Sequence, residues 1–126
     1  TVRLMERAKR AGLVLETHGS TQVASGATFV LAAGSKGHRF IDKNAVYLIH
    51  PPRKGGGFSE PTCVGIKEKA KDENEAIENE IVKTMAMWYA KLSGKSYEEA
   101  LSWIACGTWA TGAKVAIARG LADREE

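Results

Sequence analysis

Apolar residues recur every three or four positions at the start of the chain. They are Val2, Leu4, Met5, Ala8 and Ala11. This spacing predicts a short amphipathic helix that ends at Gly12, with the basic residues between them on its solvated face. Residues 13–17 follow with the sequence Leu-Val-Leu-Glu-Thr, and this apolar run predicts a short strand buried on both faces.

Residues 23–34 form a run of small and apolar side chains that closes in a glycine. We expect an apolar strand, a turn at Ser25, and then a buried helix whose small residues allow close packing against a sheet. Residues 38–41 and the apolar run 45–49 predict two further strands on either side of a turn. The second of these strands leads directly into His50.

The longest expected element covers residues 64–92, which contain no proline and one glycine at the start. Its apolar residues fall mostly four apart, which predicts a helix. They are Ile66, Ala70, Ile77, Ile81, Met85, Trp88 and Leu92. Such a helix would be about 43 Å long, whereas a compact domain of this size has a diameter of only roughly 36 Å. We therefore expect its charged first half, residues 67–80, to protrude, and its second half, with Met85, Met87, Trp88 and Tyr89, to be buried.

Two shorter helices complete the pattern. Ser96 and Glu99 have the spacing of a capping box before a helix over residues 97–104. A last helix over residues 113–118 is expected to end at Gly120. Strands alternate with helices along the chain, which indicates an α/β fold in a single domain over residues 1–126.

Composition excludes several classes of function. The net charge is only +3 and the basic residues are dispersed among acidic ones, so no nucleic-acid partner is expected. No apolar run reaches the length of a membrane span, and the opening residues lack a signal-peptide core. Cys63 and Cys106 lack the spacing of a metal site or disulfide framework, and no metal or cofactor is expected. The expected location is the cytoplasm, an organelle stroma or a virus-infected cytoplasm.

Ser25 and His50 are the residues with candidate chemistry. A serine where a strand turns into a helix can expose its hydroxyl, and the first N–H groups of that helix can receive an oxyanion. His50 follows a strand, where α/β sheets gather their sites, and a serine nucleophile needs a base within hydrogen-bond reach. From spacing alone, a helix N-cap and an ordinary histidine remain the simpler interpretation. His18 and His38 are interpreted as surface histidines.

Four blocks of sequence resemble the ClpP family of proteases. Residues 24–40, Ala-Ser-Gly-Ala-Thr-Phe-Val-Leu-Ala-Ala-Gly-Ser-Lys-Gly-His-Arg-Phe, are similar to the family's nucleophile segment. Residues 44–52, Asn-Ala-Val-Tyr-Leu-Ile-His-Pro-Pro, resemble its Asn-Ala and Ile-His-Gln-Pro histidine segment. Three glycines at 55–57 before a long charged helix resemble its handle strand and handle helix. Gly-Leu-Ala-Asp at 120–123 resembles its closing turn.

The resemblance implies a ClpP/crotonase-like fold of repeated ββα-type units with a handle region at about residues 53–92. It implies that Ser25 is the nucleophile, His50 the general base, and the backbone N–H of Gly26 an oxyanion donor. The handle glycines would bind an extended peptide as an added strand. They are Gly55, Gly56 and Gly57.

Two departures from the family pattern matter. The position of the family's triad aspartate is occupied by Thr108, and residues 104–118 contain no acid. Threonine lacks the negative charge that stabilises an imidazolium, so it could orient the histidine only through its hydroxyl. The family's opening strands, with the loop that gives a second oxyanion donor, would precede Thr1.

The function implied is a serine endopeptidase subunit of a homo- or hetero-oligomeric ring. Its substrates would be unfolded polypeptides supplied by an AAA+ ATPase unfoldase, and its handle helix would mediate ring stacking. Thr108 leaves open a catalytically inactive structural subunit of a Clp-type ring. A ClpP-like viral maturation protease is a third possibility, whereas the crotonase relatives lack this Ser/His spacing.

Overall fold

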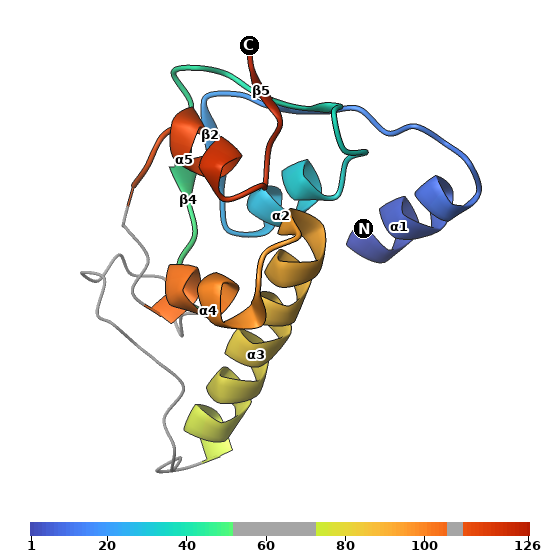
Figure 1. Cartoon of the computed structure of the whole chain (residues 1–126). Helices are drawn as coiled ribbons and strands as arrows, with labels where there is room; N and C mark the ends of the chain where they lie inside the picture. Colours follow the sequence, from blue (N-terminus) through green and yellow to red (C-terminus); the bar gives the residue numbers. More distant parts are fainter. Residues whose placement is uncertain (52–72, 106–109) are drawn as a thin grey trace.

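A computed structural model describes residues 1–51, 73–105 and 110–126, which form five helices and two small sheets (Figure 1). The elements in chain order are α1 (Val2–Arg10), β1 (Thr17–Gly19), β2 (Gln22–Ala24), α2 (Gly26–Ala32), β3 (Arg39–Ile41), β4 (Val46–Leu48), α3 (Glu73–Ser93), α4 (Tyr97–Ala105), α5 (Ala113–Ala118) and β5 (Arg124–Glu125). The predicted helical positions 64–72 lie outside the described residues.

Both sheets are parallel. One has the strand order β1-β3-β5, and the other pairs β2 with β4. Parallel neighbours require a crossover connection, and α2 lies in the connection from β2 to the strands that follow it. The alternation of parallel strands with helices confirms the α/β class predicted from the sequence.

The predicted strand over residues 13–17 is wrong. Leu13 and Val14 are 59% and 67% exposed, and β1 begins only at Thr17. The reason is pairing, since the Thr17 N–H donates to the carbonyl of His38 at 3.0 Å, just before β3 begins. Residues 13–16 precede Thr17, the first residue that pairs with β3. The two-residue strand β5 was not predicted, because two residues are too few to give a periodic pattern.

Helix α3 ends at Ser93, close to the predicted end, and its first turns project away from the sheets (Figure 1). Its buried face agrees with the prediction only near the end of the helix, where Tyr89 and Leu92 are buried. Val82, Ala86 and Tyr89 are buried, whereas Ile77 and Ile81 are 56% and 42% exposed. Met87, expected to be buried, is 63% exposed. The two faces adjoin on the helix, and packing against α2 and α4 selects the one with Val82, Ala86 and Tyr89.

The core lies between α2, α3, α4 and the strands. Phe29 of α2 stacks on Tyr89 of α3 with 4.1 Å between ring centroids, and Trp103 of α4 meets the edge of Tyr89. Trp103 is buried, and Trp88 packs against the same core. Within the described residues, no helix is both long and apolar enough to cross a membrane.

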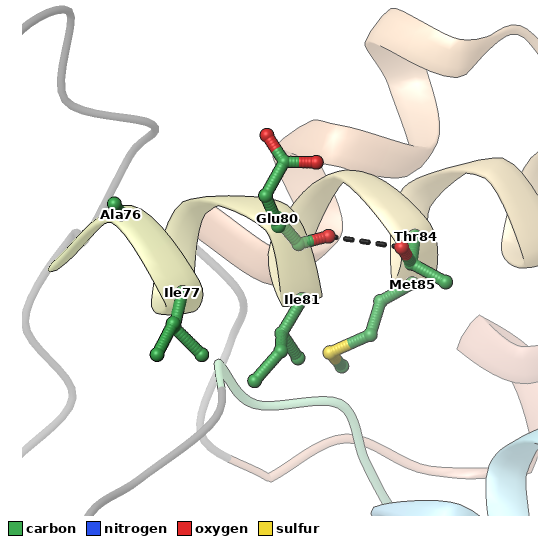
Figure 2. A pocket seen from close by; sticks show the side chains of 6 residues that line it. All are labelled: Ala76, Ile77, Glu80, Ile81, Thr84 and Met85. Carbon is green, nitrogen blue, oxygen red and sulfur yellow. Dashed lines mark hydrogen bonds between the residues drawn. The ribbon is translucent and has the colours of Figure 1, made fainter. Parts of the chain in front are cut away.

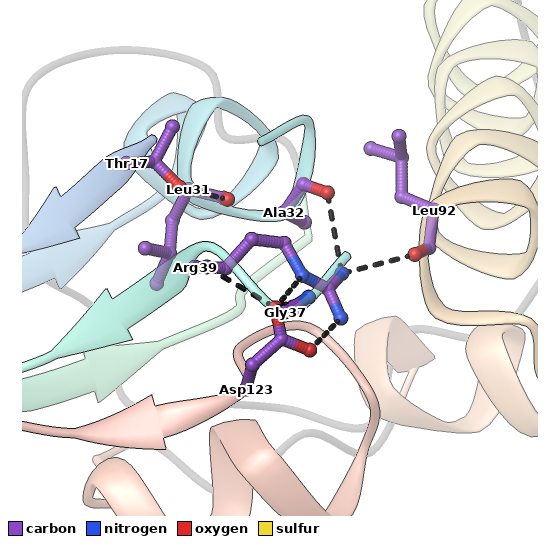
Figure 3. Close-up of polar contacts among 7 residues, drawn as sticks. All are labelled: Thr17, Leu31, Ala32, Gly37, Arg39, Leu92 and Asp123. Atoms are coloured by element: carbon purple, nitrogen blue, oxygen red, sulfur yellow. Dashed lines mark hydrogen bonds and ion pairs between the residues drawn. The ribbon is translucent and has the colours of Figure 1, made fainter. Parts of the chain in front are cut away.

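An ion pair joins three parts of the chain around Arg39, whose side chain is 3% exposed (Figure 3). Its guanidinium donates from Nε and Nη2 to the two carboxylate oxygens of Asp123, at 2.9 and 2.7 Å. Nη1 donates to the carbonyls of Ala32 on α2 and Leu92 on α3. Asp123 also accepts from the N–H of Gly37, and these hydrogen bonds, Arg39 first, hold the pKa of Asp123 below its usual value.

Candidate active site

Ser25 and His50 meet because they follow two neighbouring parallel strands. Ala24, the last residue of β2, lies opposite Leu48, the last residue of β4. The carboxyl ends of parallel strands share one edge of a sheet, and the Ser25 N–H donates to the Leu48 carbonyl at 3.1 Å. Ser25 Oγ and His50 Nε2 are in hydrogen-bond contact at this edge.

Ser25 occupies a strained turn. Its backbone has φ 53° and ψ −123°, a positive φ that residues other than glycine rarely adopt. Strand β2 ends just before Ser25 and α2 begins just after it, so the side chain is exposed to solvent at a sharp strand-to-helix turn, a geometry similar to the nucleophile elbow of α/β-hydrolases. The sequence predicted the turn but gave no sign of the positive φ.

His50 is half-buried and uses both ring nitrogens. Nε2 faces Ser25, and Nδ1 lies 2.7 Å from the main-chain carbonyl oxygen of Pro51. Among the described residues, Ser25 and Pro51 are the hydrogen-bond partners of this ring, and no carboxylate contacts it. The contact with Pro51 could not be predicted from the sequence, because a main-chain carbonyl leaves no signature in side-chain identities.

A buried pair of hydroxyls supports the Ser25 turn from behind. Thr28 Oγ1 donates to the Ser25 carbonyl at 2.6 Å and lies 2.6 Å from the Tyr89 hydroxyl. Thr28 has one hydroxyl hydrogen, so Tyr89 must be the donor of the second bond. Burial raises the pKa of Tyr89 well above its ordinary value, and its hydroxyl therefore keeps the proton that it donates. Neither residue was singled out from the sequence.

Substituting Thr28→Val is expected to lower the free energy of unfolding by about 1–3 kcal/mol, because it leaves the buried Tyr89 hydroxyl without an acceptor. Chemical denaturation at fixed protein concentration measures this. Thr28→Ser keeps the hydroxyl and is the matched control, and adding Tyr89→Phe to Thr28→Val should recover part of the loss. A Thr28→Val protein as stable as Thr28→Ser would contradict this role.

An apolar groove of about 500 Å³ begins at Gly26, the residue after Ser25. Gly26 and Phe29 of α2, Met85 and Trp88 of α3, and Val2 of α1 contribute to its lining. Gly26 itself is exposed next to Ser25, and as the first residue of a helix its N–H has no acceptor within that helix. An apolar side chain bound in this groove would lie next to the serine hydroxyl.

The other candidate residues lie elsewhere or outside the described chain. Thr108 and the glycines at 55–57 fall outside it, as do both cysteines. Asp42, the acid nearest to His50 in the preceding sequence, accepts from the Asn44 N–H in a turn. Within residues 1–51, 73–105 and 110–126, no three His, Cys, Asp or Glu side chains gather in a way that could hold a metal ion.

His18 is exposed, as its interpretation as a surface histidine requires, yet it is held in place. Nε2 lies 2.6 Å from a carboxylate oxygen of Glu16, and Nδ1 lies 2.5 Å from one of Glu126. The hydrogen bond to Glu16, helped by Glu126 and opposed by partial desolvation, raises the pKa of His18. The ring also stacks on Phe40 of β3, and its contact with Glu126 links β1 to the residue that follows β5. His38 is exposed.

Fold and site together define an α/β protein with a serine–histidine pair where two parallel strands end. The model of the Clp protease family matches residues 9–124, and the chain belongs to that family.

Solved structures with the same fold include one described as a peptidase from Plasmodium falciparum, with a TM-score of 0.66 and 15% identity. A second, described only as an enzyme, has a TM-score of 0.64 and 14% identity. Each comparison covers 99% of this chain but only 61% and 59% of the other, so the chain spans about three fifths of their length. Among curated proteins, none matches the sequence.

Proposed function

We propose that this chain is a serine peptidase subunit that hydrolyses peptide bonds by a Ser25–His50 mechanism. His50 Nε2 takes the hydroxyl proton as Ser25 Oγ attacks the scissile carbonyl, forming a tetrahedral intermediate. The same nitrogen then returns the proton to the leaving amine, and a water molecule, deprotonated in turn, hydrolyses the acyl-enzyme. The backbone N–H of Gly26 is positioned beside Ser25 to donate to the oxyanion.

One observation carries this proposal, namely the contact between Ser25 Oγ and His50 Nε2 at a strained strand-to-helix turn. A positive φ at a serine costs about 1–3 kcal/mol and persists only where the surrounding structure enforces it. Here the Thr28 hydroxyl and the Leu48 carbonyl hold the two sides of the turn. A serine that only caps a helix needs neither a positive φ nor a histidine partner. The interpretation of Ser25 as a helix N-cap therefore accounts for less of the observed geometry.

The proposed substrates are unfolded polypeptides, and the proposed setting is a homo- or hetero-oligomeric ring served by an AAA+ unfoldase. The apolar groove beside Gly26 supports a preference for an apolar side chain next to the cleaved bond. The exposed face of α3 supports assembly. Ile77, Ile81 and Met85 project from one side of the helix over a groove of about 520 Å³ (Figure 2), and such a face favours a protein contact.

A fluorophosphonate probe tests the serine mechanism. This reagent forms a covalent bond with serine hydroxyls that an adjacent base activates. We expect the full chain to be labelled once, at Ser25, after its assembly state has been measured by sedimentation velocity. Ser25→Ala should abolish labelling, whereas the control Ser20→Ala, at another exposed serine nearby, should not.

Absence of labelling in the assembled protein would contradict the peptidase proposal and would favour the structural subunit of a Clp-type ring. Labelling that survives in Ser25→Ala would also contradict it, because the reactive serine would then lie elsewhere. A viral maturation protease would be labelled in the same way, and its preference for capsid-protein substrates would distinguish it.

A further inference from the structure

The two contacts of the His50 ring determine which nitrogen carries the proton. Nδ1 lies 2.7 Å from the Pro51 carbonyl oxygen, which has no proton and can only accept. Nδ1 must therefore be the N–H donor of this bond. In a neutral imidazole the other nitrogen, Nε2, then has the free lone pair, and it is this nitrogen that faces the Ser25 hydroxyl.

The chain restricts the direction of this carbonyl from both sides. The pyrrolidine ring of Pro51 fixes its own φ. Because residue 52 is also proline, the ψ of Pro51 is confined to the extended or polyproline region. Both dihedrals that aim the Pro51 carbonyl are thus limited by the sequence Pro51-Pro52, and ordering the carbonyl costs little additional entropy.

We propose that the main-chain carbonyl of Pro51 is the positioning group of His50, with the orienting role that a carboxylate has in a serine triad. This inference rests on the proposed peptidase function. It assigns the third position to Pro51 rather than to the hydroxyl of Thr108. A carbonyl supplies a dipole but no full charge, so it selects the tautomer and the ring orientation without the full electrostatic stabilisation that a carboxylate gives an imidazolium.

The proposal is tested in the full chain by comparing two variants of residue 52 that differ in one backbone group. In the first, lactic acid replaces Pro52, so the amide after Pro51 becomes an ester, whose carbonyl is a weaker acceptor. The matched control is Pro52→Ala, which has the same side chain but retains an amide. Cys63 provides a ligation junction, so a synthetic piece over residues 1–62 can carry either change together with ¹⁵N in His50 alone.

The ¹⁵N resonances of His50 report which ring nitrogen is protonated and do not depend on activity. We expect protonation at Nδ1 in Pro52→Ala and a mixture of tautomers in the ester. We also expect kcat for a fluorogenic peptide to be about three- to tenfold lower in the ester than in Pro52→Ala, the effect of weakening one hydrogen bond, with KM unchanged. A purely structural role of Pro51 would leave the tautomer of the two chains the same.

Protonation at Nε2 in the natural chain, which keeps the restriction from Pro52, or identical tautomers in Pro52→Ala and the ester, would overturn the inference. If both chains react with the fluorophosphonate and yet have identical tautomers, the peptidase function stands and Pro51 is not the positioning group. If neither chain reacts, the peptidase function fails, and the tautomers still decide whether Pro51 positions the ring.

Discussion

Replacing Ser25 with alanine is expected to lower kcat for peptide hydrolysis by more than about 10³-fold. In a serine peptidase with a full triad, losing the serine costs about 10⁶-fold and losing the aspartate about 10⁴-fold, and the losses do not add. If the histidine were not oriented at all, the rate would already be about 10⁴-fold below that of a full triad. Ser25→Ala would then lower kcat by only about a further 10²-fold. Because the Pro51 carbonyl holds the base nitrogen of His50 toward Ser25, the loss should exceed that figure.

Steady-state kinetics of the purified assembly with a fluorogenic peptide measure this loss. His50→Ala should lower kcat by a similar factor, and the double variant should be no worse than either single variant, because the two side chains act as one unit. Ser20→Ala serves as the control and should retain the full rate. Independent, multiplying losses from Ser25 and His50 would mean that the two residues do not share a catalytic step.

The meeting of Ser25 and His50 could be predicted because it depends on a few strong local signals. An apolar strand that ends in Ala-Ser-Gly and another that ends in Ile-His are visible as strings of letters. Once both strands are parallel neighbours, their carboxyl ends must share an edge. The resemblance to the ClpP family added the expectation that the two segments belong together. The family match over residues 9–124 bears that resemblance out.

The features that escaped prediction depend on backbone geometry and tertiary choice. The φ of 53° at Ser25 arises from the way α2 and β4 hold the turn, and a serine gives no hint of it. The Pro51 contact uses a main-chain atom that every residue has. On α3 the spacing allowed two adjacent faces, and the partners α2 and α4 decided that Val82 rather than Ile81 would be buried.

The strand expected at residues 13–17 shows the same limit in another form. Leu13, Val14 and Leu15 have the composition of a buried strand, yet the first two are among the most exposed apolar residues described. Strand propensity largely expresses the presence of a neighbour to pack and pair with. Pairing with β3 begins at Thr17, so the same local signal that succeeded for β4 failed here.

Asp123→Ala is expected to lower the free energy of unfolding by about 3 kcal/mol or more, because it leaves the buried guanidinium of Arg39 without its ionic partner. The carbonyls of Ala32 and Leu92 would remain as acceptors, but neither carries a charge. The control Glu125→Ala removes an exposed acid from the adjacent strand and should change stability by less than about 0.5 kcal/mol. Equal effects of the two substitutions in urea denaturation would show that the ion pair contributes nothing.

The pH dependence of the free energy of unfolding distinguishes the effect of the Asp123 charge from the effect of its packing. Its pKa in the folded protein lies below the ordinary value of 3.8, chiefly because Arg39 donates hydrogen bonds to the carboxylate. The stabilisation is therefore complete above that ordinary value and is lost as the pH falls through the lower folded pKa. Asp123→Asn preserves the shape but does not titrate. The difference in stability between the natural protein and Asp123→Asn should be constant near neutral pH and shrink below pH ~4. A difference that persists undiminished in acid would mean that the carboxylate acts through its shape and not through its charge.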